Sequence, residues 1–232
     1  INQLCKVSGA ELDVVPLSLE IPTANFVEKE ALTEDELCSV MSTGAQAVNS
    51  NADILLLGEM GIGNSTVSAA LAASVFGGDV ARWVGAGTGS DEAGIARKQT
   101  VIEQGLKIHG SRTDVSALLA FGGREQAAIC GAVLAARLAH IPVILDGFIC
   151  TAAAAPLFGM APDSLNHCLV GHASAEPGHK HLLAAMDKLA ILQLDMRLGE
   201  GTGAAVALSV LRGAVACHNQ MATFESAGIA GA

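Results

Sequence analysis

Hydrophobic and polar positions group along this chain into blocks that predict strands and helices in turn. Ile54–Leu57 is a continuous apolar run ahead of a glycine loop, as expected of a strand buried on both faces of a parallel sheet. Similar runs predict strands over Leu12–Leu19, Pro142–Asp146 and Cys168–Val170. Strands that alternate with helices indicate a single α/β domain over residues 1–232, with a Rossmann-like parallel sheet flanked by helices and right-handed crossovers.

Helix signals fall between these runs. Thr33-Glu-Asp-Glu36 is a capping box that predicts a helix to about Val48. Further helices are predicted from Ser65 or Thr66 to about Phe76, from about Glu92 to Ile108, from residues 122–126, from Thr151 onward, after Pro177, and from about Thr202 to His218. Because ligands of parallel α/β sheets bind at the carboxyl ends of strands, we expect every glycine cluster to lie there.

The glycine loop at residues 58–64 predicts an anion site. Glycine lets the backbone turn sharply and approach a ligand, and the free amides of the helix that follows Gly63 attract negative charge. The glycine spacing is that of a P-loop, but Asn64 stands where the P-loop has its lysine, and the dinucleotide fingerprint is not met. A ligand with a single phosphate fits this loop best. An ordinary glycine-rich turn is the alternative.

Composition excludes several classes of function. The chain has 232 residues, 51% of them hydrophobic, and can bury a large core without disulfides. A formal net charge of −10 and an aromatic content of 3% argue against a nucleic-acid surface. Six cysteines without a CxxC pair indicate reduced thiols in the cytoplasm rather than a zinc or redox site. No charge-free apolar run reaches the roughly 18 residues of a membrane span, so no membrane partner is expected.

Four glycine-flanked motifs follow one another along the chain: GEMGIGN (58–64), WVGAGTG (83–89), DGF (146–148) and RLGEGTG (197–203). Together with HASAEPG (172–178), they resemble the nicotinate-nucleotide:dimethylbenzimidazole phosphoribosyltransferases of cobalamin lower-ligand assembly. The resemblance implies transfer of the phosphoribosyl group of nicotinate mononucleotide to 5,6-dimethylbenzimidazole. The products would be α-ribazole 5′-phosphate, inverted at the anomeric carbon, and nicotinate. It also implies a homodimer and no cofactor.

The resemblance assigns roles to single residues. Glu200 matches the general base, which the reaction needs because the entering imidazole must lose its N–H proton. Glu59 matches a supporting acid near the ribose. The remaining substrate-binding residues are expected to be Gly61, Gly63, Gly87, Gly89, Lys98, Gly147, Ser174 and Leu198, the last of these in the benzimidazole pocket.

Each assignment has a non-functional alternative. Glu200 could cap a helix, and Glu59 could complement a helix dipole as a first-turn carboxylate. Lys98 could be a solvated helix lysine and Leu198 a core residue. No metal site is predicted, because the spacing of His172 and His179 suits neither a helical pair nor a zinc loop.

The chain differs from the family pattern at its start. Family members carry an amino-terminal helical segment that builds a small domain with the carboxyl-terminal helix, and the resemblance implies that this segment is missing upstream of residue 1. We therefore expect an incomplete small helical domain. One side of the last helix, with Val206, Leu208 and Leu211, is expected either to pack across the dimer or to drive aggregation. The alternative function is that of a truncated, catalytically weak relative that binds the nucleotide without turnover.

Overall fold

In the computed structural model, which describes residues 1–87 and 89–229, short parallel strands form one sheet in the order β1-β2-β3-β4. The strands are β1 (Leu55–Leu57), β2 (Val143–Leu145), β3 (Cys168–His172) and β4 (Ala190–Leu192). Each neighbouring pair is parallel, and Ile144 lies opposite both Leu56 and Leu169. The predicted α/β class with a parallel sheet is therefore confirmed. The strand order follows the sequence, so each new strand is added to the same edge of the sheet.

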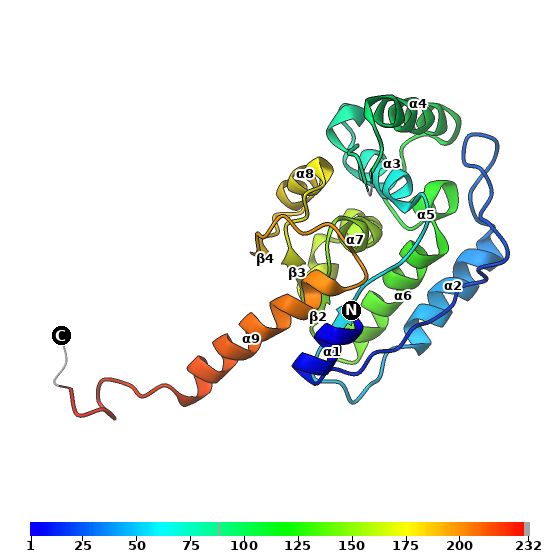
Figure 1. Ribbon diagram of the computed structural model, residues 1–232. Helices are drawn as coiled ribbons and strands as arrows, with labels where there is room; N and C mark the ends of the chain where they lie inside the picture. Colours follow the sequence, from blue (N-terminus) through cyan, green and yellow to red (C-terminus); the bar gives the residue numbers. More distant parts are fainter. Residues whose placement is uncertain (88, 230–232) are drawn as a thin grey trace.

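Helices occupy every connection between the strands (Figure 1). Their bounds are α1 (Asn2–Ser8), α2 (Glu34–Gln46), α3 (Asn64–Phe76), η1 (Val80–Arg82), α4 (Glu92–His109), α5 (Ser116–Phe121), α6 (Arg124–Leu138), α7 (Phe148–Met160), η2 (Pro162–Leu165), α8 (Pro177–Ala185) and α9 (Thr202–Gln220). The first half of α9 lies against the sheet, and the rest of this helix extends away from the body (Figure 1). No helix within the described residues is long and apolar enough to cross a bilayer.

The strand side chains alternate between two faces of the sheet. Leu57, Val143 and Leu145 belong to the large core that the sheet forms with the helices between the strands. Ile144 points to the other face, where it packs with Ala204 of α9. Since right-handed crossovers of a sequential sheet cover a single face, α9 is the element that covers the second one.

Helices α2 and α6 touch at backbone distance. A Cβ atom on Gly44 would lie 1.9 Å from the carbonyl oxygen of Ala128, and one on Gly131 would lie 2.0 Å from that of Met41. Only glycine permits this approach. The contact fixes α6, whose first turn reaches the glycine loop after β1.

Several sequence-based expectations about the elements are wrong. Leu12–Leu19 is not a strand: these residues are mostly exposed, have no ladder partner among residues 1–87 and 89–229, and include Pro16, which lacks an N–H donor. β1 is half-buried rather than buried on both faces, because it lies at the edge of the sheet. The glycine cluster at 83–89 follows η1 instead of a strand.

The expectation for the last helix also fails in part. Leu208 is 3% exposed, so it belongs to the chain's own interior and cannot form a dimer face. Leu211 packs on the cluster around Ile144. The short elements α1, α5 and β4 have too few residues to show a periodic pattern, and they were not predicted.

Candidate active site

Glu200 lies in a turn of three consecutive residues with left-handed backbone: φ is 81° at Gly199, 60° at Glu200 and 74° at Gly201. For a residue with a side chain this conformation costs roughly 1–2 kcal/mol, so neighbouring groups must hold it. The Glu200 N–H donates to the carbonyl oxygen of Glu59 at 3.1 Å, and the Gly201 N–H donates to Asp146 Oδ2 at 3.2 Å. These hydrogen bonds thus fix the Glu200 backbone just ahead of α9.

The glycine loop after β1 touches this turn through Gly58. A Cβ atom on Gly58 would lie only 2.3 Å from the backbone nitrogen of Gly201. Likewise, a Cβ atom on Gly199 would lie 3.1 Å from Glu59 Oε1. Gly58 therefore serves the contact between two loops, a role that its place in a phosphate-like motif did not reveal.

Glu59 is surrounded by other carboxylates. Burial raises the pKa of Glu59 to about 7, and repulsion from Glu125, Asp146 and Glu200 adds to the rise. A short hydrogen bond from Asn64 Nδ2 to Glu59 Oε2 acts in the opposite direction. The Glu59 carboxyl group can therefore both gain and lose a proton near neutral pH.

Glu125, in the first turn of α6, is a site residue that sequence reasoning missed. Its Oε1 would lie 2.3 Å from a Cβ atom on Gly61, so its carboxylate lies directly behind the glycine loop. Burial raises the pKa of Glu125 as well. In the sequence, the GGRE segment at 122–125 indicates only the start of a helix. The acidic residue at its end is the one feature that could have pointed to a site residue.

Replacing Glu59 by glutamine should stabilise the fold at alkaline pH. Because the folded-state pKa of Glu59 is about 7 rather than the usual 4.5, the folded protein holds this proton where the unfolded chain releases it. Wild-type stability should therefore fall as the pH rises from about 4.5 to 7. At pH 8, Glu59→Gln should gain up to about 3 kcal/mol, and at pH 5 the gain should be small. Urea unfolding at both pH values measures it.

The matched control is Glu103→Gln, at an exposed position of α4. This variant should change the free energy of unfolding by less than about 0.5 kcal/mol at either pH. An equal gain for Glu59→Gln at pH 5 and pH 8 would contradict the titration of Glu59.

Lys98, the N-terminus of α3 and the loop of Gly87 form a candidate anion site. Lys98 Nζ donates to Ser65 Oγ at 3.1 Å and to the carbonyl oxygen of Gly85 at 3.2 Å. A Cβ atom on Gly87, where φ is 61°, would lie 3.1 Å from Lys98 Nζ. Gly63 is the N-cap of α3. An ammonium group, a helix N-terminus and a glycine loop meet here, which is the usual composition of a phosphate site.

Gly63 and Gly89 are not glycine for reasons of packing, because no atom of the described residues lies within 4 Å of a Cβ atom placed on either. Their φ angles of 79° and 149° nevertheless favour glycine, since residues with a side chain rarely adopt this conformation.

Ser174 and Gly147 are joined by a buried hydrogen-bond chain. The Ser174 N–H donates to His179 Nδ1 at 3.0 Å, so the ring carries its proton on Nε2. Nε2 lies 3.2 Å from Thr151 Oγ1, which donates to the carbonyl oxygen of Gly147 at 2.8 Å. Burial lowers the pKa of His179 to about 3, which keeps the ring neutral. Sequence reasoning missed this function of His179.

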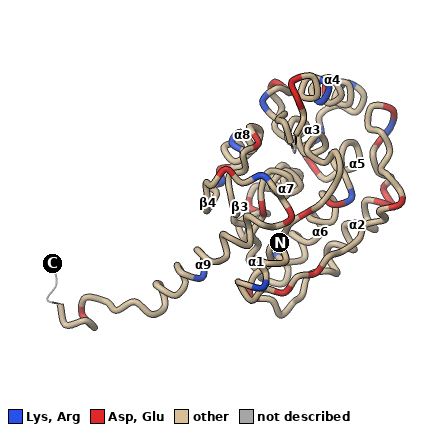
Figure 2. Tube along the Cα trace, viewed as in Figure 1, with Lys and Arg blue, Asp and Glu red and all other residues tan. Residues whose placement is uncertain are grey.

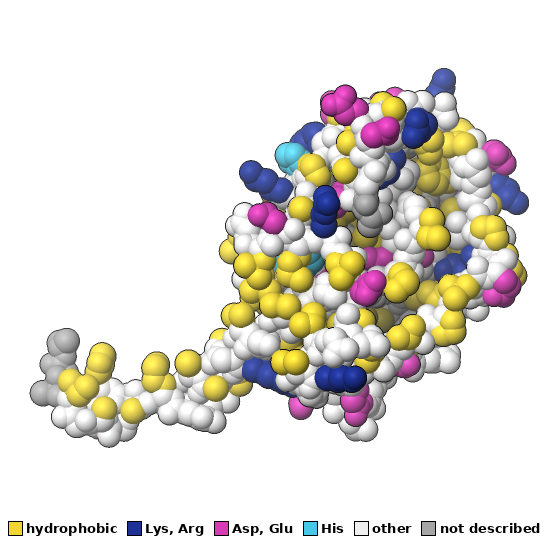
Figure 3. Space-filling model, viewed as in Figure 1, with side chains coloured by type: hydrophobic (Ala, Val, Ile, Leu, Met, Phe, Trp, Pro, Cys, Tyr) yellow, Lys and Arg dark blue, Asp and Glu magenta, His cyan; other side chains and the backbone are white. Residues whose placement is uncertain are grey.

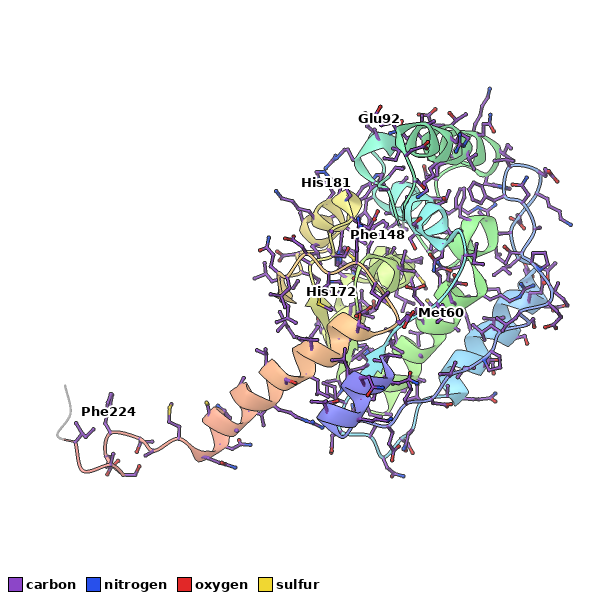
Figure 4. The ribbon with its side chains drawn as sticks, viewed as in Figure 1. Met60, Glu92, Phe148, His172, His181 and Phe224 are labelled. Carbon is purple, nitrogen blue, oxygen red and sulfur yellow. The ribbon has the colours of Figure 1, made fainter. Side chains whose placement is uncertain are left out.

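The carboxylates lie next to exposed apolar side chains. Met60, Ile62 and Leu198 are 79%, 107% and 64% exposed. Figure 3 shows a hollow between the α3–α4 region and α9, with acidic side chains on its floor and hydrophobic ones around it. Met60 projects from the loop between β1 and α3, close to the first turn of α9 (Figure 4). An apolar ring could thus reach Glu200 from this side.

The described residues contain no group of three or more His, Cys, Asp or Glu side chains arranged to hold a metal ion. All six cysteines are free thiols.

Comparison with known proteins gives consistent matches. A family model described as phosphoribosyltransferase matches residues 1–229. The chain is 57% identical to the nicotinate-nucleotide–dimethylbenzimidazole phosphoribosyltransferase of Rhodobacter capsulatus, over 99% of this chain and 69% of that protein. It is 54% identical to the enzyme of the same name from Roseobacter denitrificans, over 99% of this chain and 68% of that protein. The crystal structure of CobT from Thermus thermophilus superposes with a TM-score of 0.88 at 34% identity, over 100% of this chain and 75% of that one.

Proposed function

Because the chain belongs to the phosphoribosyltransferase family, we propose that it transfers the phosphoribosyl group of nicotinate mononucleotide to 5,6-dimethylbenzimidazole. Nicotinate leaves with the electron pair of the glycosidic bond, and the anomeric carbon gains oxocarbenium character. An imidazole nitrogen attacks from the opposite face, so the configuration inverts and α-ribazole 5′-phosphate forms. Both substrates are small molecules, and the step needs no cofactor.

Glu200 is the general base in this proposal. As the new bond forms, the second imidazole nitrogen becomes acidic and passes its proton to the carboxylate. The exposed Leu198 beside the turn offers an apolar surface for the benzimidazole ring. Glu59, whose pKa burial raises to about 7, lies behind Glu200 and supports the site near the ribose.

The phosphate of the nucleotide binds where Lys98, the N-terminus of α3 and the loop of Gly87 meet. Lys98 contributes the positive charge, and the amides near Gly61, Gly63 and the loop of Gly87 and Gly89 contribute neutral donors. Gly147 and Ser174 complete the nucleotide site from the ends of β2 and β3.

The contact between the Glu59 and Glu200 loops is the observation that supports this proposal most, because both carboxylates belong to loops beside a hollow with hydrophobic side chains around it. An assay of nicotinate release, with and without dimethylbenzimidazole, tests it. Release that depends on the base supports the transferase. Tight binding of the mononucleotide without release would instead support the nucleotide-binding module, although 57% identity to a named transferase favours the enzyme.

We propose that the active unit is a homodimer. The outer part of α9 and the segment after it carry few charges, Arg212 and Glu225 among them (Figure 2). Their exposed apolar side chains are Val210, Val215, Met221, Phe224 and Ile229. An apolar surface of this kind is typical of protein contacts. Light scattering over a concentration series should give twice the chain mass of 23.4 kDa, and a monomer at every concentration would refute the dimer.

A further inference from the structure

We propose that Asp146 is a positioning residue that holds the Glu200 turn in its reactive geometry. Sequence reasoning gave Asp146 no role beyond the end of a strand. The inference rests on the proposed function, in which Glu200 is the base.

The backbone of Asp146 is fixed from both sides. Its N–H donates to the carbonyl oxygen of Leu57, the last residue of β1, at 3.1 Å. Its own carbonyl oxygen accepts from the N–H of His172, the last residue of β3, at 3.2 Å. Asp146 is therefore anchored to the ends of both neighbouring strands, and its side chain starts from a defined point.

The side chain of Asp146 caps α9 although it is far from this helix in the sequence. The N-cap residue of α9 is Gly201, which has no side chain to accept hydrogen bonds from the first amides of the helix. Asp146 Oδ1 accepts from the Ala204 N–H at 2.8 Å, and Oδ2 accepts from the Gly201 N–H at 3.2 Å. The negative charge also complements the positive end of the helix dipole.

Asp146 cannot reach a substrate itself. It is 2% exposed, and the ring of His172 lies beside it, with Nε2 3.8 Å from Asp146 Oδ1. Any effect of Asp146 on the reaction must therefore pass through the groups it holds. Of these, the Gly201 amide adjoins Glu200 directly.

The Glu200 turn needs such a support. Glu200 has φ of 60° between two glycines that also have positive φ, so the turn would relax without its external hydrogen bonds. A displacement of about 1 Å can cost a catalytic group up to roughly 10²-fold in rate. A rigid carboxylate behind the turn prevents this displacement.

The test is a double-mutant cycle with the full chain. Asp146→Asn keeps the size of the side chain but places an NH₂ group or a weaker acceptor against the two amides. It should lower kcat about 10–100-fold and change KM for nicotinate mononucleotide less than about threefold. In the Glu200→Gln background, the same change should cost less than about threefold, since there is no base left to position. Equal losses in both backgrounds would overturn the inference.

Two further measurements separate positioning from folding. Hydrogen exchange at the Gly201 and Ala204 amides should be faster in Asp146→Asn than in the wild type, and unchanged exchange would contradict the inference without reference to activity. The control Thr33→Ala removes the cap of α2, where Thr33 accepts from the Glu36 N–H. It should lower the melting temperature and leave kcat unchanged.

Gly58→Ala provides a second route if Asp146→Asn does not fold. Its Cβ atom would press on the Gly201 nitrogen, so it moves the same turn while the Asp146 side chain stays intact. It should show the same loss of kcat and the same dependence on Glu200, whereas Gly213→Ala, with no neighbour within 4 Å, should show neither. Additive losses for Gly58→Ala would refute the role of the turn geometry. A wild type without base-dependent nicotinate release would instead refute the proposed function.

Discussion

Glu200→Gln should lower the turnover of nicotinate mononucleotide with dimethylbenzimidazole by roughly 10²–10⁴-fold. Glutamine keeps the size and the hydrogen-bonding oxygen of the side chain, but it cannot accept the proton that the entering imidazole must release. The Glu200 backbone would remain bonded to the Glu59 carbonyl oxygen, so the turn should keep its shape. Steady-state kinetics and calorimetry measure the loss and the retained binding of the mononucleotide.

Glu103→Gln, which removes an exposed carboxylate on α4, is the control and should retain full turnover. Unchanged turnover in Glu200→Gln would remove Glu200 from the role of base. A matching loss of mononucleotide affinity would indicate that the substitution disturbs the nucleotide site instead.

The sequence predicted the sheet and most helices because their signals are local. The apolar runs that became β1, β2 and β3, and the capping box at Thr33, need only a few neighbouring residues to act. Leu12–Leu19 shows the limit of this reasoning. An apolar run becomes a strand only if a partner strand lies beside it, and none lies beside this one among the described residues.

The site shows the same division between local and distant signals. Glycine loops, Glu59, Lys98 and Glu200 were recognisable as motifs, and the structure brings Glu59 to Glu200 and Lys98 to Ser65. The roles of Asp146, known only as part of the DGF motif, and of Glu125 were not recognised, because they depend on contacts with segments far away in the sequence. Asp146 and Ala204 are joined across 58 positions, for example.

The role of Gly58 also lies outside local reasoning. A glycine at the start of such a loop is expected to admit a phosphate. Here the Glu200 turn occupies that space, and it lies too close for a Cβ atom on Gly58. The glycines of one motif thus serve two purposes, one toward the ligand and one toward the Glu200 turn.

Lys98→Met should weaken nicotinate mononucleotide and leave free dimethylbenzimidazole unaffected. Methionine retains much of the length of the lysine side chain but lacks the ammonium group that faces Ser65 and the loop of Gly87. The expected loss is about 1.5–3 kcal/mol, which is the range for a hydrogen bond to a charged group and corresponds to roughly 10–150-fold in Kd. Calorimetry with each ligand separately measures it.

Lys107→Met is the matched control, because Lys107 is an exposed lysine on the same helix α4. It removes the same formal charge from the chain without touching the second glycine loop, so general electrostatic attraction would weaken equally in both variants. A loss confined to Lys98→Met and to the phosphate-bearing ligand assigns the ammonium group to the phosphate. If both ligands weakened alike in Lys98→Met, the effect would come from a disturbed junction between α3 and α4, and Lys98 would hold the structure rather than the substrate.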